Sequence, residues 1–206
     1  GAIYAQRSTG FYNFDLKVDN STFINNKAEG TSSGGAIALV QLDATAKITD
    51  SKFIANHANG KTGYGGGAIY VSSASNYYRY GTMTITGTLF ENNTCGANGG
   101  AIYGRVTTVN VANSVLINNS DVNGLAVYGY KTDSASPSIT LNDNWWGSND
   151  SPKSLVGGNG YKPTLNRWAI LTVTNDSAIE AGNTVKLTVS INNYTTGTVN
   201  GSMSKP

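Results

Sequence analysis

Two short sequence patterns alternate strictly along this chain and recur at a nearly constant spacing. The first is Gly-Ala-Ile-Tyr, with its Ala at positions 2, 36, 68, 101 and 126, the last in the degenerate copy 125–128. Successive copies are therefore 34, 32, 33 and 25 residues apart. A period of this length is typical of solenoids and propellers, in which each repeat is one supersecondary unit stacked on the next.

The second pattern is a β-branched residue, a turn-forming residue two positions later, a large apolar residue three further on, and Asn three after that. Its copies are Val18-Asn20-Phe23-Asn26, Ile48-Asp50-Phe53-Asn56, Ile85-Gly87-Phe90-Asn93, Val111-Asn113-Leu116-Asn119 and the less regular Leu141-Asp143-Trp146. Asn, Asp and Gly tolerate positive φ, so a single residue can form a corner between two short strands. About three strands and single-residue corners per repeat predict an all-β chain that winds as a parallel β-helix of about five coils, rather than a propeller.

Winding in one direction would stack equivalent residues of consecutive coils. One inward stack is expected from Ile3, Ile37, Ile69, Ile102 and Val127, and another from Phe23, Phe53, Phe90, Leu116 and Trp146. The Asn residues of the second pattern would form a ladder of side-chain amides, which stabilises stacked β structure by satisfying polar groups at the corner: Asn26, Asn56, Asn93 and Asn119.

The repeats end near residue 147, and the sequence then changes character. Residues 148–166 follow a Trp-Trp-Gly segment and are expected to be a cap and linker. Residues 167–174 and 184–191 have the pattern of strands, the second with strict alternation of apolar and polar residues. They resemble the first strands of an immunoglobulin-like β-sandwich, which needs about seven strands, so residues 167–206 are expected to be an incomplete module.

The composition excludes several classes of protein. Charged residues make up 13% of the chain, whereas 25 Asn and 25 Gly supply uncharged polarity and disfavour helix. A net charge of +2, with no basic cluster, argues against a nucleic-acid partner. The longest apolar run, 36–40, is too short to span a membrane. Gly1 begins a repeat unit without an initiator Met, so we expect an excerpt of a longer protein.

No motif for a cofactor or metal is found. Cys95 and His57 are each the only residue of their type, which excludes a disulfide framework, and Asn142-Asp143-Asn144 lacks the further ligands of a calcium loop. Polysaccharide-cleaving β-helices need clustered carboxylates, but the 12 acidic residues are scattered among loops and corners. The sequence therefore predicts no catalytic residues.

The Gly-Gly-Ala-Ile-Tyr and Phe-Ile-Asn-Asn elements, with Asn-Trp-Trp-Gly-Ser-Asn-Asp-Ser-Pro and Arg-Trp-Ala-Ile-Leu-Thr-Val, together resemble adhesin-like surface proteins of methanogenic archaea. The repeats alone also resemble those of chlamydial polymorphic outer-membrane proteins. The resemblance implies a right-handed β-helix followed by immunoglobulin-like modules, in an extracellular protein on the cell surface that mediates attachment. It supplies no catalytic residues.

Aromatic residues provide the candidate contact surface. Tyr4, Tyr70, Tyr103 and Tyr128 share one strand position, with Ala38 in the gap, and should form an outward column. Such columns most often stabilise a sheet, but exposed aromatic faces beside amides also recognise sugars. The candidate ligand contacts are therefore Tyr70, Tyr103 and the loop residues Tyr77, Tyr78, Arg79 and Tyr80. Among the Asn-x-Ser/Thr triplets, Asn92 and Asn118 are the best candidates for glycosylation.

Three functions fit these features. The favoured one is a non-enzymatic, adhesin-like module that presents a rigid face to a glycan or protein on another cell. The second is a structural coat, spacer or filament module, with self-association through the solenoid ends. The third is a fragment of a polysaccharide-acting enzyme whose catalytic coils lie outside this chain.

Overall fold

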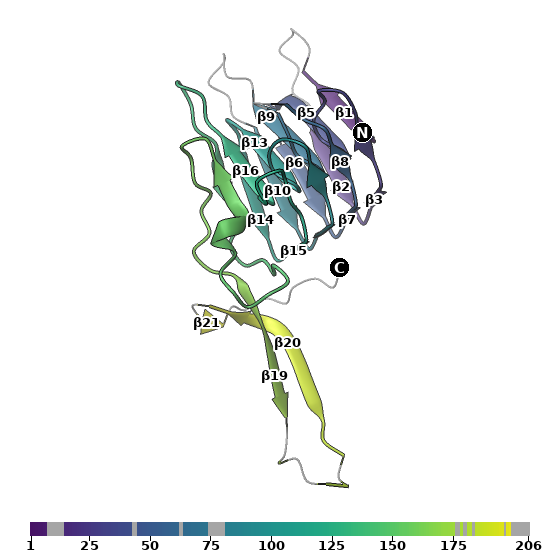
Figure 1. Ribbon diagram of the computed structural model, residues 1–206, viewed down its shortest axis with the longest axis vertical. Helices are drawn as coiled ribbons and strands as arrows, with labels where there is room; N and C mark the ends of the chain where they lie inside the picture. Colours follow the sequence, from purple (N-terminus) through teal and green to yellow (C-terminus); the bar gives the residue numbers. More distant parts are fainter. Residues whose placement is uncertain are drawn as a thin grey trace.

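The computed structural model describes residues 1–7, 15–42, 45–61, 64–73, 81–175, 178, 181–182, 184–195 and 197–198. The repeats wind into a parallel β-solenoid of about five turns, with strands of successive turns side by side (Figure 1). The expected parallel solenoid is therefore confirmed. In the described part of the chain, no helix has the length and apolar character needed to cross a membrane.

The first sheet is built from the Gly-Ala-Ile-Tyr strands and has six members. They are β1 (Ile3–Gln6), β5 (Ile37–Leu42), β9 (Ile69–Ser73), β13 (Ile102–Arg105), β16 (Val127–Tyr130) and β18 (Val156–Gly158). Ile3, Ile37, Ile69, Ile102 and Val127 are in register and face the core, as expected. Val156 extends this stack, because β18, in the segment expected to be a cap and linker, pairs in parallel with β16.

The second sheet carries the β-branched residues of the second pattern. It contains β2 (Leu16–Asp19), β6 (Thr45–Thr49), β10 (Thr82–Thr86), β14 (Thr108–Ala112) and β17 (Ser138–Thr140). Val18, Ile48, Ile85 and Val111 are in register and buried in the same core.

Two shorter sheets, of four and three strands, form the remaining sides of the solenoid. The third contains β3 (Thr22–Ile24), β7 (Lys52–Ile54), β11 (Leu89–Glu91) and β15 (Val115–Ile117), and the fourth contains β4 (Lys27–Ala28), β8 (His57–Ala58) and β12 (Thr94–Cys95). The rings of Phe23 and Phe53 are stacked with centroids 4.8 Å apart, and those of Phe53 and Phe90 are 5.0 Å apart. Leu116 and Trp146 belong to the same buried cluster, so this stack also forms as expected.

Left-handed corners join the second and third sheets. The corner residues are Asn20, Asp50, Gly87, Asn113 and Asp143, with φ between 43° and 66°. A second set of left-handed residues joins the third and fourth sheets: Asn25, Ala55, Asn92 and Asn118. Asn, Asp and Gly are suited to this conformation, and Ala55 shows that the position also accepts a residue without a polar side chain.

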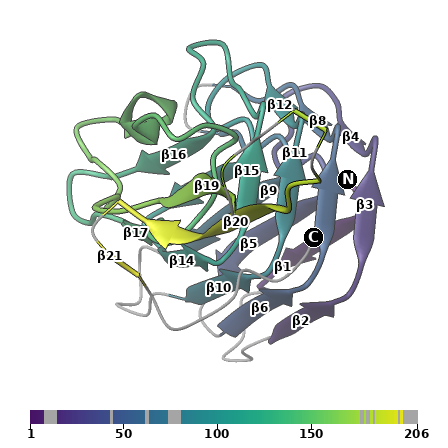
Figure 2. The same ribbon diagram turned by 90° about the horizontal axis from the view of Figure 1, so that it is seen from below.

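The end of the chain leaves the solenoid. The short 3-10 helix η1 (Pro152–Leu155) precedes β18, and beyond it β19 (Ala169–Asn175), β20 (Leu187–Tyr194) and β21 (Gly197–Thr198) form an antiparallel sheet. This ribbon projects away from the coils in Figure 1, and in Figure 2, seen from below, β20 lies across the front of them. The described residues of the tail thus form one sheet of three strands, and a second sheet of the expected sandwich is not seen among them.

Candidate functional site

The outer face of the first sheet carries a tyrosine column, formed by Tyr70, Tyr103 and Tyr128. Because side chains alternate along a strand, the residue after each inward Ile or Val points outward. The ring centroids of Tyr70 and Tyr103 are 5.5 Å apart, and those of Tyr103 and Tyr128 are 5.7 Å apart. The sequence therefore placed these residues on the correct face of the sheet.

Most of the column is buried although it lies outside the solenoid core. Tyr103 is 0% exposed and Tyr70 is 3% exposed. A loop that returns to the first sheet lies close to Tyr103: a Cβ on Gly65 would lie 3.0 Å from Cδ2 of Tyr103 and would clash with the carbonyl oxygen of Asn98, so the backbone at this position requires glycine. Burial raises the pKa of both phenols. In this structure neither ring presents a free face to a ligand, because the loops occupy that face.

The remaining predicted contacts have different surroundings. Tyr77, Tyr78, Arg79 and Tyr80 lie outside the described residues. Tyr4, which shares the strand position of the column, is 67% exposed, and its hydroxyl donates to Oε1 of Gln6 at 2.6 Å. Ala38 lies between Tyr4 and Tyr70 in the register. The structure thus does not bring the predicted contacts together as one exposed surface among the described residues.

The amide ladder lies at the corner between the third and fourth sheets. The Nδ2 of Asn26 donates to Oδ1 of Asn56 at 2.9 Å, Asn56 donates in the same way to Asn93 at 2.9 Å, and Asn93 donates to Asn119 at 2.8 Å. Each acceptor oxygen also receives the backbone N–H of the preceding Asn, and each buried amide donates a second bond to a backbone carbonyl. The ladder therefore satisfies the polar backbone where the chain bends inward.

A second polar column at the preceding corner was missed by the sequence analysis. Its members are Ser21, Ser51, Thr88, Ser114 and Asn144, each three positions after the β-branched or Leu residue of the second pattern. The hydroxyl of Ser51 accepts the N–H of Ser21 at 3.1 Å, and that of Ser114 accepts the N–H of Thr88 at 3.1 Å. Oδ1 of Asn144 accepts the N–H of Ser114 at 3.0 Å. The constant spacing of hydroxyl residues was a signal for this column in the sequence.

The candidate glycosylation residues Asn92 and Asn118 have exposed side chains at left-handed corners, with φ of 55° and 54°. Each directly precedes a member of the amide ladder. The two Asn side chains of each pair therefore have opposite environments, since the first is exposed to solvent and the second is buried. An attached glycan at the first position would not disturb the ladder.

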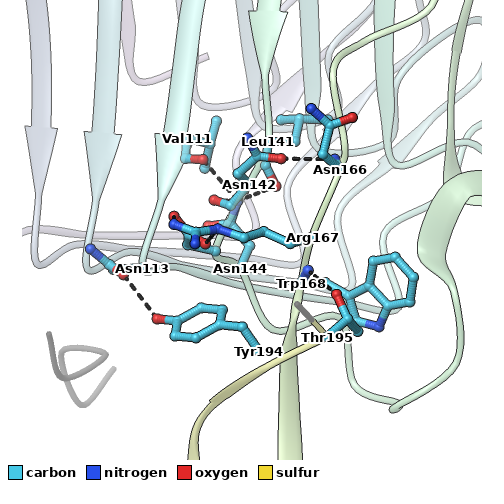
Figure 3. A network of polar contacts seen from close by, with 11 residues as sticks. Val111, Asn113, Leu141, Asn142, Asn144, Asn166, Arg167, Trp168, Tyr194 and Thr195 are labelled. Carbon is cyan, nitrogen blue, oxygen red and sulfur yellow. Dashed lines mark hydrogen bonds and ion pairs between the residues drawn. The ribbon is translucent and has the colours of Figure 1, made fainter. Parts of the chain in front are cut away.

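The solenoid ends in a polar network that joins it to the tail (Figure 3). Asn144 donates from Nδ2 to the carbonyls of Val111 and Leu141, both at 2.8 Å. The Nη2 of Arg167 donates to Oδ2 of Asp143 at 2.8 Å, and this carboxylate raises the pKa of Arg167. The hydroxyl of Tyr194 lies 3.4 Å from Oδ1 of Asn113.

Apolar contacts reinforce this junction. Ala169 and Tyr194 from the antiparallel sheet form a buried cluster with Val115 on the outer face of the third sheet, and Trp145 and Ile191 pack against it. The N–H of Ala169 donates to the carbonyl of Asn144 at 2.9 Å. The tail is thus packed on the last coils rather than hanging free at its base.

Cys95 and His57, the side chains of this chain most often reactive in other proteins, are held by packing and hydrogen bonds. Cys95 is 4% exposed and packs with Ala28 and Ala58, and burial raises the pKa of its thiol. The Nδ1 of His57 lies 2.8 Å from Oγ1 of Thr94, and its Nε2 lies 2.8 Å from Oδ1 of Asn59. Within the described ranges, no three His, Cys, Asp or Glu residues form a group that could hold a metal ion.

A comparison with known protein families matches this chain to the Chlamydia polymorphic membrane protein repeat, at residues 20–39 and 87–105. Each matched segment runs from a left-handed corner through a member of the Phe stack and the amide ladder to a strand of the first sheet. The expected likeness to chlamydial repeats is therefore confirmed. The likeness to adhesin-like proteins of methanogenic archaea stays a prediction.

Among curated proteins, the chain is similar to the probable autotransporter YfaL of Escherichia coli (strain K12), with 32% identity over 124 residues. The match covers 58% of this chain and 9% of the autotransporter, so the chain corresponds to a small part of that protein. The comparison with solved structures found no match. The comparisons thus relate the coils of this solenoid to the polymorphic membrane protein repeat and to a small part of an autotransporter.

Proposed function

We propose that this chain is a non-enzymatic, adhesin-like module that presents a rigid β-helical face for attachment to glycans or other cells. The observation that carries the proposal is the regular solenoid, in which apolar residues stack from coil to coil and two polar columns bond the backbone at the corners of the described coils. Such a rod holds its outer loops at fixed spacing, which suits recognition of an extended surface.

The comparisons support an extracellular location on the cell surface. Membrane-protein repeats and an autotransporter are the proteins to which the chain is similar. We further propose that the tail is the start of an immunoglobulin-like module and that the parent is related to adhesin-like surface proteins of methanogenic archaea. The antiparallel strands β19 and β20, packed directly on the last coils, support the first of these.

The surroundings of individual carboxylates support a non-enzymatic role. Asp19 accepts a hydrogen bond from Thr49, and Asp15 accepts two from Thr45. Asp143 pairs with Arg167. The carboxylate of Asp121 accepts backbone N–H groups of Gly99, Asn123 and Leu125 at 2.7–2.9 Å. These side chains hold corners and loops in place, which leaves them poorly arranged for general acid or base catalysis.

The proposal can be tested with beads coated with the whole chain. Binding to a glycan array and to cultured cells is expected, and it should be lost when the chain is unfolded before coupling. Absence of binding to every glycan and cell would overturn adhesion in favour of a spacer or coat module. Shortened or deacetylated products after incubation with polysaccharides would overturn the non-enzymatic assignment.

A further inference from the structure

A pocket of about 460 Å³ lies on the outer face of the first sheet, next to Ala38. Tyr4 and Tyr64 contribute exposed aromatic rings, the buried Tyr70 lies behind Tyr64, and Glu29 and residues 31–34 of the loop after β4 also line the pocket. Pockets that bind small molecules usually have volumes of about 300–1,000 Å³. This pocket is therefore large enough for a ligand of one or two rings.

The pocket lies where the tyrosine column lacks one ring. The register places Tyr4, Ala38 and Tyr70 on three neighbouring strands at the same outward position. Neighbouring strands are about 4.8 Å apart, so the backbones of Tyr4 and Tyr70 are separated by about 9.6 Å. That separation leaves room for one ring between two others. In later coils Tyr103 and Tyr128 fill the equivalent positions.

The walls combine aromatic faces with hydrogen-bonding groups. Tyr64 is 45% exposed and stacks on Tyr70 with ring centroids 6.1 Å apart, which makes it an accessible platform. The Oγ of Ser33 is buried and has no hydrogen-bond partner within the described residues. A buried hydroxyl without a partner is costly and gains a favourable interaction when a ligand supplies one. Thr31 and Ser32 add two further hydroxyls to the lining.

We propose that this pocket binds a single neutral hexopyranose unit of a glycan. The apolar face of a pyranose can stack on an aromatic ring while its hydroxyls bond to Ser and Thr side chains. Among the side chains of the lining, Lys27 and Glu29 carry opposite charges, which favours a neutral sugar over an acidic one. This inference rests on the proposed attachment function and specifies one place where contact is made.

The test is isothermal titration of the whole chain with the methyl glycosides of glucose, galactose and N-acetylglucosamine, and with p-cresol as an aromatic probe. Ala38→Tyr places in the gap the residue that the later coils carry, so binding of the glycoside should fall by at least about tenfold. Ser33→Ala should weaken binding by about three- to tenfold through loss of one hydrogen bond. Lys47→Tyr is the matched control: it adds a ring at an exposed strand position of the same coil and should leave binding unchanged.

The outcomes separate this inference from the proposed function. Binding of p-cresol but of no glycoside would overturn the sugar assignment, as would glycoside binding that Ala38→Tyr and Ser33→Ala leave unchanged. If the beads adhere to cells and Ala38→Tyr beads adhere equally, the pocket is not the contact, whereas attachment itself stands. Glycoside binding that responds to both variants, without adhesion to cells or to any glycan on the array, would support the pocket and overturn the attachment function.

Discussion

Asn56 gives both its side-chain and its backbone N–H to the same oxygen, Oδ1 of Asn93, each at 2.9 Å. The arrangement repeats from coil to coil, so each amide holds the bend of the coil before it. Both side chains are fully buried. A donor or acceptor left unpaired there would have no access to water, which makes the ladder sensitive to single substitutions.

Asn93→Ala should lower the free energy of unfolding by about 3 kcal/mol or more, because it leaves several buried backbone and side-chain groups without partners. Urea denaturation followed by circular dichroism would measure this. Asn92→Ala is the control, since Ala55 already occupies the equivalent left-handed corner with φ of 52°. The control should cost less than about 1–2 kcal/mol. Equal destabilisation by both variants would show that the ladder has no special role.

Tyr103→Phe should leave the free energy of unfolding unchanged or raise it by about 1 kcal/mol, because the buried Tyr103 hydroxyl has no hydrogen-bond partner in the described part of the chain. Tyr70→Phe is the comparison: its hydroxyl interacts with Ser72 and Arg105, so its loss should destabilise the fold. Thermal unfolding of the two variants would distinguish them. A larger loss for Tyr103→Phe than for Tyr70→Phe would contradict this account.

Alkaline pH should destabilise the protein through the same column. Burial raises the pKa of Tyr103 above its ordinary value of 10.0, so the folded state retains a proton that the unfolded state loses. The stabilisation is complete below pH 10 and declines as the pH rises above that value. Unfolding at pH 8 and pH 11 would measure the decline, which Tyr103→Phe should reduce but not abolish, since burial also raises the pKa of Tyr70 and Tyr128. A decline unchanged in Tyr103→Phe would mean that other groups cause it.

Asp143→Asn should loosen the base of the tail while keeping the left-handed corner, because Asn20 and Asn113 occupy the same conformation in other coils. Only the ion pair with Arg167 is removed. Since the Arg167 side chain is 35% exposed and solvent screens the pair, the expected loss of stability is small, and it should shrink further at high salt. Faster amide hydrogen exchange in β19 and β20, with unchanged exchange in β10, would be the expected result. Faster exchange throughout the solenoid would instead show that Asp143 supports the coils.

The thiol of Cys95 should react with a disulfide reagent at least about 100-fold more slowly in the folded protein than in urea, because reaction requires local opening. Its raised pKa further reduces the thiolate fraction. Cys95→Ala should cost no more than about 1 kcal/mol, since Ala28 and Ala58 occupy the same position in earlier coils. Rapid labelling of the native chain would show that the fourth sheet opens readily.

The repeating part of the fold could be predicted because each coil obeys the same local rules. The spacing of Val18, Phe23 and Asn26 fixes one corner, one inward ring and one amide of the ladder, and the next coil repeats them in register. The column of Ser51 and Ser114 follows from the same spacing. Ser and Thr are common throughout this chain, so a single hydroxyl residue at one position does not indicate a buried polar column.

The burial of the tyrosine column could not be predicted from the strand pattern. Alternation shows that Tyr103 points away from the core, but not that a later loop lies over it. That depends on how closely the backbone at Gly65 can approach the ring, which is a property of the folded loop. The pocket beside Ala38 could not be predicted either. The sequence shows that a ring is missing from the column at this position, but not where the neighbouring loop lies relative to the gap.

The amide ladder also has a direction. Every rung from Asn26 to Asn93 donates toward the later coil, and the last amide, Asn119, turns back to the carbonyls of Phe90 and Ile117. The two ends of the amide ladder therefore differ chemically. At the first end, Asn26 can accept a hydrogen bond from a further amide, whereas at the last end both N–H groups of the Asn119 amide already donate to backbone carbonyls. Lengthening by this interaction is possible only head to tail, so the rod has an intrinsic polarity, as a filament with distinct ends does.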